Sequence, residues 1–319
     1  MNHRTHKLRI TLTLSQAIEG YLFEKRVTFK PATLKNYGYV LDKLRAHFAG
    51  DPRLRDITAR DIHALLDRYN TQLSGKSLLN IHAVCSSLWT WAVKEGYALE
   101  NIVRQVPAPQ PEKRAIIPYT EDDVRAMLEA CRVTREYQRP GKVACANSRP
   151  TALRDRALIL LLLDSGVRAS ELCALRIEHL DKNNSRIKVF GKGSKERIIR
   201  IGRRTGKAIW RYLATRPDLL PTDPLFVADQ TATRPLSRYS LHHLIKRIGR
   251  RAGITPDAHP HRFRHTFAIT FLRNGGDVYS LQALLGHSTL EMVQRYLQLA
   301  QTDTENAHRR ASPVDNWRL

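Results

Sequence analysis

Cysteine is scarce in this sequence, and the few cysteines are scattered. The 319 residues include four, namely Cys85, Cys131, Cys145 and Cys173, and no two of them form a Cys-x-x-Cys pair. Zinc ribbons and disulfide frameworks need closely spaced or numerous cysteines, so this pattern argues against both and fits reduced thiols. We therefore expect a protein of a reducing compartment.

Long apolar runs are also missing. The sequence contains no stretch of about 18 or more apolar residues, no signal-peptide core and no lipidation motif. On this basis we expect no membrane-spanning helix, no cleaved secretion leader and no lipid anchor. We expect a cytoplasmic protein with no membrane partner.

Acidic residues are few relative to basic ones. Lys and Arg total 53 against 30 Asp and Glu, which gives a formal net charge of +23. The excess lies in both parts of the chain, with 18 basic against 10 acidic residues in positions 1–115 and 35 against 20 in the remainder. Such a charge is self-repulsive unless a polyanion is near, and nucleic acid is the usual one. The alternative is a solvated, inert basic surface. Two basic parts favour a protein that grips DNA from both sides.

The N-terminal third is predicted to be a helical domain over residues 1–105. Apolar residues recur at helical spacing in four segments, which begin near Leu14, Leu34, Thr58 and Ser77. Basic residues lie between these apolar stripes, and we take five of them as weak DNA-binding candidates. They are Lys30, Lys35, Arg45, Lys76 and Lys94. Each alone is more often a solvated charge than a phosphate contact, but together they favour DNA binding.

A proline-rich segment separates this domain from the rest of the chain. Pro107, Pro109 and Pro111 favour extended geometry and cannot continue a helix, so we assign residues 106–115 to a linker. A second domain is expected over residues 116–319, with a C-terminal tail from about residue 302.

The second domain is predicted to be mainly helical with one hairpin. Residues 186–190 and 196–201 read as strands joined by a glycine-containing turn. Helices are expected over residues 154–163, 205–213, 240–252, 263–273, 278–285 and 290–299. The fold class is therefore mainly α with a small antiparallel sheet, in two domains.

Arg168 is a candidate phosphate ligand. It follows a helix stop at Gly166 and precedes a new helix, whose N-terminus adds positive potential. Glu171, three residues later, could orient its guanidinium. Arginine suits phosphate because its planar fork meets two oxygens and stays charged when desolvated. Taken alone, however, this pair is more often an ordinary surface ion pair.

A cluster of histidines and arginines begins at His259. His261 and Arg264 lie three residues apart on one helical face, so both can point into one site. His259, His261 and His265 could instead bind a metal. Because Arg262 and Arg264 would repel a divalent ion and no carboxylate interrupts the run, we expect no metal here.

Three further residues complete the candidate set. Lys192, in the turn of the hairpin, could protonate a leaving alkoxide, and its glycine-rich setting does not match a phosphate-binding P-loop. His287 lies in a turn between two helices, and Tyr296 lies on the second of them. A phenol with a pKa of about 10 is a poor nucleophile unless cations or a base flank it. Without such neighbours the segment is a helix-turn-helix in which Tyr296 only packs.

The order of these residues resembles the catalytic set of the tyrosine recombinase (phage integrase) family. That set runs Arg, Lys, His-x-x-Arg, His and Tyr, and the corresponding residues here are Arg168, Lys192, His261, Arg264, His287 and Tyr296. The family's Leu-Gly-His precedes the tyrosine as usual. The motifs cover about residues 116–311, and the helical, basic character of a core-binding domain covers residues 12–105. Glu171 stands where the family has its supporting acid.

The resemblance implies an Xer-like site-specific recombinase without a separate arm-binding domain. Such an enzyme is a C-shaped clamp that cleaves and rejoins double-stranded DNA at a specific recombination site. It acts through a 3′-phosphotyrosyl link and a Holliday junction and needs no cofactor or metal. The implied partners are a homo-tetramer in the synapse and an accessory directionality factor, and the implied location is the nucleoid.

Other functions stay open on the sequence. A non-catalytic, basic DNA-binding regulator accounts for the charge but not for the spacing of Arg168, Lys192 and His261. A metal-dependent nuclease and a type IB topoisomerase that relaxes DNA as a monomer are further alternatives.

Overall fold

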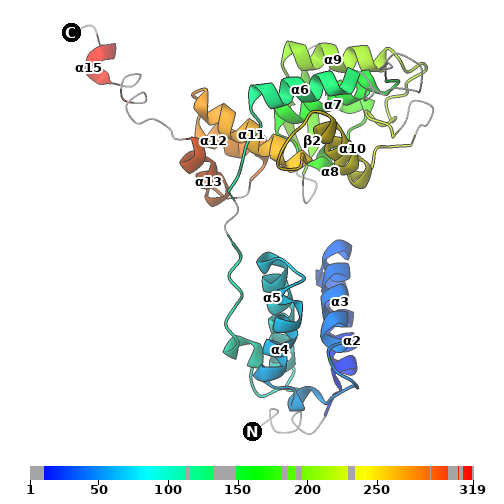
Figure 1. Ribbon diagram of the computed structural model, residues 1–319, viewed down its shortest axis with the longest axis vertical. Coiled ribbons are helices and arrows are strands. Elements are labelled where there is room, and N and C mark those ends of the chain that lie inside the picture. The colour runs from blue at the N-terminus through cyan, green and yellow to red at the C-terminus, as the bar shows by residue number, and fades with distance from the viewer. Residues whose placement is uncertain are drawn as a thin grey trace, which may run out of the picture. The chain divides into compact units, whose positions relative to one another are not determined.

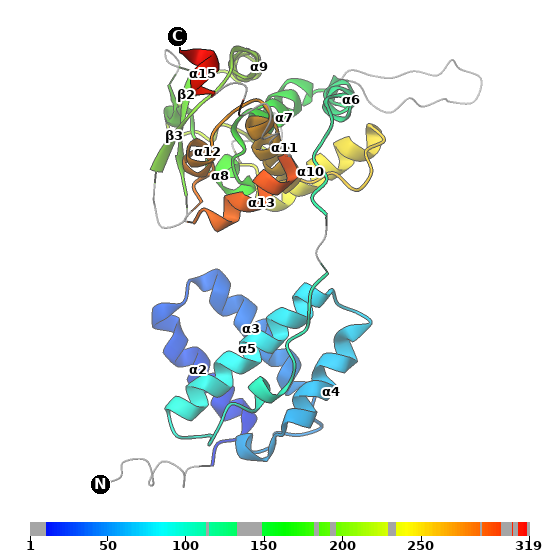
Figure 2. The same cartoon turned by 90° about the vertical axis from the view of Figure 1, so that its left-hand side faces the viewer.

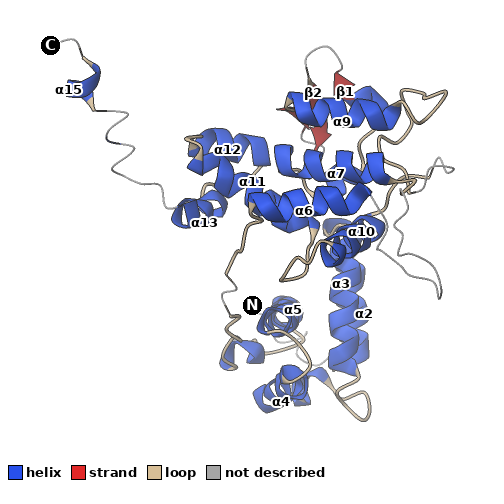
Figure 3. Ribbon diagram, turned by 45° about the horizontal axis from the view of Figure 1, so that its top comes forward, coloured by secondary structure: helices blue, strands red, loops and turns tan. Residues whose placement is uncertain are grey.

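Two units make up the fold, which we describe from a computed structural model. The described residues are 11–112, 115–132, 149–181, 185–191, 196–228, 234–287, 289–300, 308 and 312–317. Contacts divide the chain into Met1–Arg114 and Ala115–Leu319. Helices dominate the described residues, and the strands form one small sheet in the second unit (Figure 3).

The first unit consists of helices joined by short turns (Figure 1). Its elements are α2 (Leu14–Thr28), α3 (Pro31–Arg45), η1 (Leu54–Asp56), α4 (Ala59–Asn70), α5 (Gly75–Lys94) and η2 (Ile102–Gln105). The sequence marks several of these starts. Thr58 and Asp61 form a capping box at the start of α4, and Pro31 occupies the first turn of α3, where its missing N–H costs no hydrogen bond. Ser74 caps α5, so this helix begins two residues before the expected Ser77.

Helix α5 is the centre of the first unit, since it contacts α2, α3 and α4. Its buried residues form a wide apolar stripe, and two polar contacts fix it against α2. The Trp91 indole donates to Glu24 at 2.6 Å, and the Tyr21 hydroxyl lies 2.7 Å from that of Ser87. Val106, which we expected in the linker, is buried in this core. The first core therefore extends into the proline-rich segment.

The five basic residues proposed for DNA binding are all exposed on this unit. Four of them, Lys30, Lys35, Lys76 and Lys94, lie at or near helix ends or on exposed helix faces. Arg45 donates to Asp42 at 2.6 Å. An exposed pair of this kind contributes little stability, about 0–1 kcal/mol.

The second unit contains the sheet and the remaining helices (Figure 2). Its elements are α6 (Glu121–Arg132), α7 (Ala152–Ser165), α8 (Ala169–Cys173), η3 (Ile177–His179), β1 (Leu180–Asp181), β2 (Arg186–Phe190), β3 (Glu196–Arg200), α9 (Arg203–Leu213), α10 (Arg238–Arg251), α11 (Pro260–Arg273), α12 (Val278–Leu285), α13 (Glu291–Ala300) and α15 (Pro313–Asn316). The expected fold class, mainly α with a small antiparallel sheet, is confirmed.

Helix α11 joins two apolar clusters of the second unit. Phe263, near its start, belongs to a large cluster built on α6–α10 and the sheet. Ala268, Ile269 and Leu272, further along, belong to a smaller cluster with α12 and α13. The helix contacts α7, α12 and α13, and Figure 2 shows it among them. Side chains between these two clusters on α11 therefore lie where several helix ends meet.

The sheet is antiparallel with the order β1-β2-β3. Arg186 pairs with Arg200 and Phe190 with Glu196, which gives the expected hairpin, while the two-residue β1 was not expected. In β2, Ile187 and Val189 face the core, as period-two alternation requires. The turn residue Lys192 lies outside the described residues.

None of the helices in the described ranges combines the length and the apolar character that crossing a membrane would need.

Candidate active site

The end of α7 is in close contact with α11 and α12. Gly166 ends the helix with a φ of +59°, a conformation that glycine adopts without strain. A Cβ at this position would lie 2.5 Å from the ring of Phe267 and 2.9 Å from Leu285. Only glycine allows the three helix segments to approach this closely, and the candidate residues lie around this contact.

Arg264 is buried at the contact, with 1% of its surface exposed. Its guanidinium donates to the carbonyl of Gly166 at 2.8 Å and to the carbonyl of Leu285 at 2.7 Å, and one nitrogen lies 2.7 Å from Nε2 of His287. Helix ends leave carbonyls without partners, and α7 and α12 present such carbonyls here. A buried arginine needs acceptors of this kind, because an unpaired buried cation is very costly.

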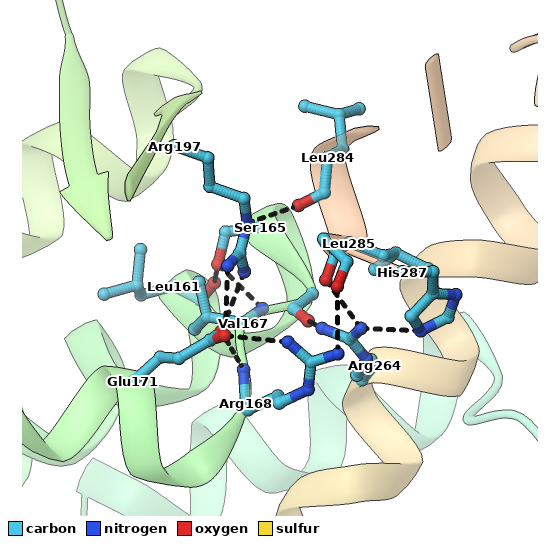
Figure 4. A network of polar contacts seen from close by, with 12 residues as sticks. Leu161, Ser165, Val167, Arg168, Glu171, Arg197, Arg264, Leu284, Leu285 and His287 are labelled. Carbon is cyan, nitrogen blue, oxygen red and sulfur yellow. Dashed lines mark hydrogen bonds and ion pairs between the residues drawn. The ribbon is translucent and has the colours of Figure 1, made fainter. Parts of the chain in front are cut away.

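Arg168 lies beside Arg264 although it is distant in sequence. Its side chain is partly exposed and donates to the carbonyl of Gly286 at 3.2 Å. Since Leu285 and Gly286 are successive residues, the two guanidinium groups bind neighbouring carbonyls. Figure 4 shows both arginines in one network.

Arg168 is also bound by Glu171, three residues further along the chain. Its carboxylate accepts from the Arg168 side chain at 2.9 Å and from the Arg168 backbone N–H at 2.8 Å. Arg197 of β3 donates to both oxygens of the same carboxylate and to the carbonyl of Leu284 (Figure 4). Burial acts to raise the pKa of Glu171, but the hydrogen bonds of Arg197 and Arg168 outweigh it and the pKa is lowered. Glu171 is therefore a carboxylate at neutral pH.

The site has an excess of positive charge. Three guanidinium groups, those of Arg168, Arg197 and Arg264, face one carboxylate. Burial, followed by repulsion from Arg168, lowers the pKa of Arg264 to about 10, so that it remains charged at neutral pH. Backbone carbonyls offset part of this charge, and an entering anion such as a phosphate would offset more.

His287 follows the two carbonyls directly. Burial, and then the charges of Arg264 and Arg168, lower its pKa to about 4, so the ring is neutral at neutral pH. A guanidinium can only donate, so Nε2 of His287 is the acceptor from Arg264 and the ring proton resides on Nδ1. This Nδ1 is buried and has no hydrogen-bond partner among the described residues. A phosphate oxygen is the kind of acceptor that would satisfy it.

Tyr296 packs against this group from α13. It is 5% exposed, and its ring is stacked on that of His287 with centroids 6.3 Å apart. Its hydroxyl lies 2.9 Å from Nδ1 of His265. Burial raises the pKa of Tyr296 even though Arg264, Arg295 and Arg168 act to lower it. The phenol is therefore protonated at neutral pH.

The start of α11 is fixed by its own histidine and arginine. His259 caps the helix by accepting the backbone N–H of Arg262, and the Arg262 guanidinium donates to the carbonyls of Ile117, Pro118 and Pro256. These contacts give Arg262 and His259 structural roles. Among the residues that the structure describes, no group of three His, Cys, Asp or Glu side chains is arranged to hold a metal ion.

The structure brings together most of the residues singled out from the sequence. Five of them form one continuous set of contacts: Arg168, Glu171, Arg264, His287 and Tyr296. His261 joins through His265, since their ring centroids are 4.2 Å apart. Lys192 lies outside the described residues and is therefore not included in this set.

Sequence reasoning missed Arg197 and left His265 only as a metal alternative. Both had a signal. Strand alternation puts Arg197 on the same face as the buried Ile199, where a charge needs a partner. Helical spacing puts His265 on the face of His261 and Arg264.

Comparison with known proteins gives a consistent set of relatives. The model of the phage integrase family matches residues 119–303. Tyrosine recombinase XerC of Alcanivorax borkumensis is 30% identical over 280 residues, which cover 86% of this chain and 85% of that protein. Tyrosine recombinase XerD of Xanthomonas campestris pv. campestris is 30% identical over 293 residues, or 86% of each chain. The Tn1549 transposon integrase, solved in complex with transposon right-end DNA, has a TM-score of 0.73 at 19% identity and covers 94% of this chain and 99% of that one. That structural likeness shows a common fold.

Proposed function

The chain belongs to the phage integrase family and is a site-specific tyrosine recombinase of the Xer type, and we propose that Tyr296 is its nucleophile. Tyr296 attacks a DNA phosphodiester and becomes linked to the 3′ phosphate, which conserves the bond energy for rejoining. A second DNA hydroxyl then displaces the tyrosine, and exchange of strands gives a Holliday junction.

One observation carries this proposal. Arg168 and Arg264 bind the carbonyls of successive residues directly before His287, and His287 is stacked on Tyr296. The positive charge of the site and the nucleophile are thereby next to each other. A protein that only bound DNA would not need a buried phenol beside the buried Arg264 and the partly exposed Arg168, so the non-catalytic regulator is not favoured.

The arginines stabilise the charge that develops on the phosphate. Arg168 and Arg264 are already held by carbonyls and by Glu171, so little reorganisation is needed when a phosphate enters. Fixed cations at the non-bridging oxygens contribute most of the stabilisation in phosphoryl transfer. His287 donates its Nδ1 proton to one of these oxygens.

The leaving 5′ oxygen must take up a proton, because an alkoxide is a poor leaving group. We assign this role to Lys192. The hairpin that carries it is anchored to the site by Arg197, which supports the assignment.

The first unit would bind the DNA as a core-binding domain, with the second unit as the catalytic domain. The exposed cations Lys30, Lys35, Lys76 and Lys94 support this role. The two units would close on a specific double-stranded recombination site as a clamp, and four protomers would form the synapse, by analogy with relatives. A lambda integrase tetramer has been solved on a Holliday junction. Nothing in the fold or the relatives supports the accessory directionality factor expected from the sequence.

A suicide substrate tests the proposal. A duplex recombination site with a nick beside the scissile phosphate loses its short 5′ fragment after cleavage, which traps the covalent adduct. We expect an adduct with wild-type protein and none with Tyr296→Phe, since the variant keeps the ring but lacks the oxygen. An undiminished adduct in Tyr296→Phe refutes the assignment of the nucleophile.

A further inference from the structure

His265 is the residue in direct contact with the proposed reacting oxygen that the mechanism above does not use. Its Nδ1 lies 2.9 Å from the Tyr296 hydroxyl, and the ring centroids are 5.6 Å apart. The two residues come from α11 and α13, which pack together in the smaller apolar cluster. A hydrogen bond of this length is within the range required for proton transfer.

We infer that His265 is a catalytic residue, which accepts the phenolic proton of Tyr296 through Nδ1 as the tyrosine attacks. The inference rests on the proposed role of Tyr296. It assigns the base function to His265 rather than to His261, the histidine that the family order singles out.

The Tyr296 oxygen forms a bond to phosphorus while its proton moves to Nδ1 of His265, which becomes an imidazolium. The bond from phosphorus to the 5′ oxygen breaks, and that oxygen takes a proton from the general acid. In rejoining, the 5′ hydroxyl attacks phosphorus and gives its proton back to the group that had acted as the general acid. The phenolate leaves, and the His265 imidazolium returns its proton to it.

The surroundings of His265 keep it neutral before DNA binds. Burial is the largest cause, followed by the facing groups His261, His259, Arg295 and Arg264, and together they lower its pKa to about 4. A neutral imidazole protonated on Nε2 leaves Nδ1 free to accept.

The same surroundings tie the proton transfer to the presence of substrate. Without DNA, burial and the neighbouring cations oppose a positive charge on His265, and burial opposes ionisation of Tyr296. A phosphate anion beside Arg264 weakens that opposition. The tyrosine is thus activated when the phosphate arrives and stays a neutral phenol otherwise.

The matched variant is His265→Asn. Its amide oxygen can take the place of Nδ1 and accept the same hydrogen bond, but it cannot take up a proton. We expect the single-turnover rate of adduct formation to fall by about 100-fold or more, with DNA affinity unchanged. His179→Asn is the control, because the His179 Nδ1 also accepts a hydrogen bond, from the Arg176 N–H, in a different part of the unit. A rate for His265→Asn within about threefold of the wild type means that the residue only positions Tyr296 and overturns the inference.

A second substrate separates the base from the acid. When sulfur replaces the bridging 5′ oxygen, the leaving group is a good one and needs no protonation. We expect this substrate to restore cleavage by Lys192→Ala but not by His265→Asn. Restoration of His265→Asn would show that His265 serves the leaving group, which also overturns the inference.

A third measurement holds even if the asparagine variant folds poorly. In His265→Ala, free imidazole should restore adduct formation in proportion to its unprotonated fraction, which a purely structural role would not produce. Absence of any restoration in an Ala variant that still binds DNA contradicts the base role. If the wild-type protein itself forms no adduct, the result contradicts the proposed function and not only the role of His265.

Discussion

Arg197 binds both oxygens of the Glu171 carboxylate, at 3.0 Å and 2.7 Å. Its Nε also donates to the carbonyl of Leu284 at 2.8 Å. The Arg197 side chain therefore joins the start of α8 to the end of α12. Because Glu171 in turn accepts a hydrogen bond from Arg168, Arg197 also fixes the position of Arg168. The position of Arg168 relative to Arg264 thus depends on Arg197, which need not contact the phosphate itself.

Loss of Arg197 should therefore impair cleavage through Arg168. In Arg197→Leu the buried Glu171 carboxylate keeps only its contacts with Arg168, so it will draw that guanidinium out of position. We expect adduct formation to slow by roughly 10- to 100-fold, as small displacements of a catalytic group commonly do. The single-turnover rate on the nicked substrate measures this.

Arg200→Leu is the control for Arg197→Leu. Arg200 lies on the same strand, is exposed, and loses the same charge. If both variants slow cleavage equally, the effect is one of overall charge and not of the contact with Glu171.

Local patterns in the sequence predicted the helices and the hairpin because each depends on neighbouring residues. Gly166 as a helix stop and the helix start near Thr58 are examples. The site was predicted from the order of residue types, which resembles a family. The partners inside the site were not predictable in this way, since Arg197 meets Glu171 and Leu284 only through tertiary packing. His265 directly follows Arg264 in the sequence. Its contact with Tyr296 could not be predicted, because that contact depends on how α11 packs against α13.

Gly166→Ala should be strongly destabilising. The residue has a φ of +59°, which costs a non-glycine residue about 1 kcal/mol, and the new methyl group would meet Phe267 and Leu285. We expect a loss of about 2–4 kcal/mol in the free energy of unfolding, measured by urea denaturation.

Gly253→Ala separates the two causes of that loss. Gly253 has a φ of +70°, but a methyl group added there would have no neighbouring atom within 4 Å. We expect only the conformational cost, about 1 kcal/mol. Equal losses for the two glycines would mean that close packing at Gly166 contributes nothing.

The two site histidines should make stability depend on pH. The pKa of His265 and that of His287 are each lowered to about 4, so both are neutral in the folded protein. The unfolded chain binds protons on these residues below about pH 6.5, and the folded protein does not. Their contribution is therefore full above about pH 6.5 and is lost as the pH falls towards 4. We expect the double variant His265→Asn with His287→Asn to lose about 1–3 kcal/mol less stability between pH 7.5 and pH 5, because both rings are only half-buried and solvent screens part of the effect.

Other histidines with lowered pKa values act in the same direction and are common to both proteins. They are His47, His179 and His259. The comparison of wild type and double variant removes their contribution, and His63→Asn, at an exposed position of α4, controls for the loss of a histidine. If the wild type and the double variant show the same pH dependence in urea denaturation, the two site histidines are not kept neutral by the fold.

The salt dependence of DNA binding should report the contacts of the first unit. Each phosphate that a lysine neutralises adds about 0.9 to the slope of log K against log salt concentration. We expect Lys30→Gln with Lys35→Gln to reduce the slope by about 2 and to weaken binding to specific and unrelated duplexes alike, because phosphate contacts carry no sequence information. The control replaces Asp42 by Asn and Arg45 by Gln together, which removes an exposed cation without changing the net charge. It should alter the slope by no more than about 1, and an unchanged slope in the lysine variant would mean that neither lysine contacts DNA.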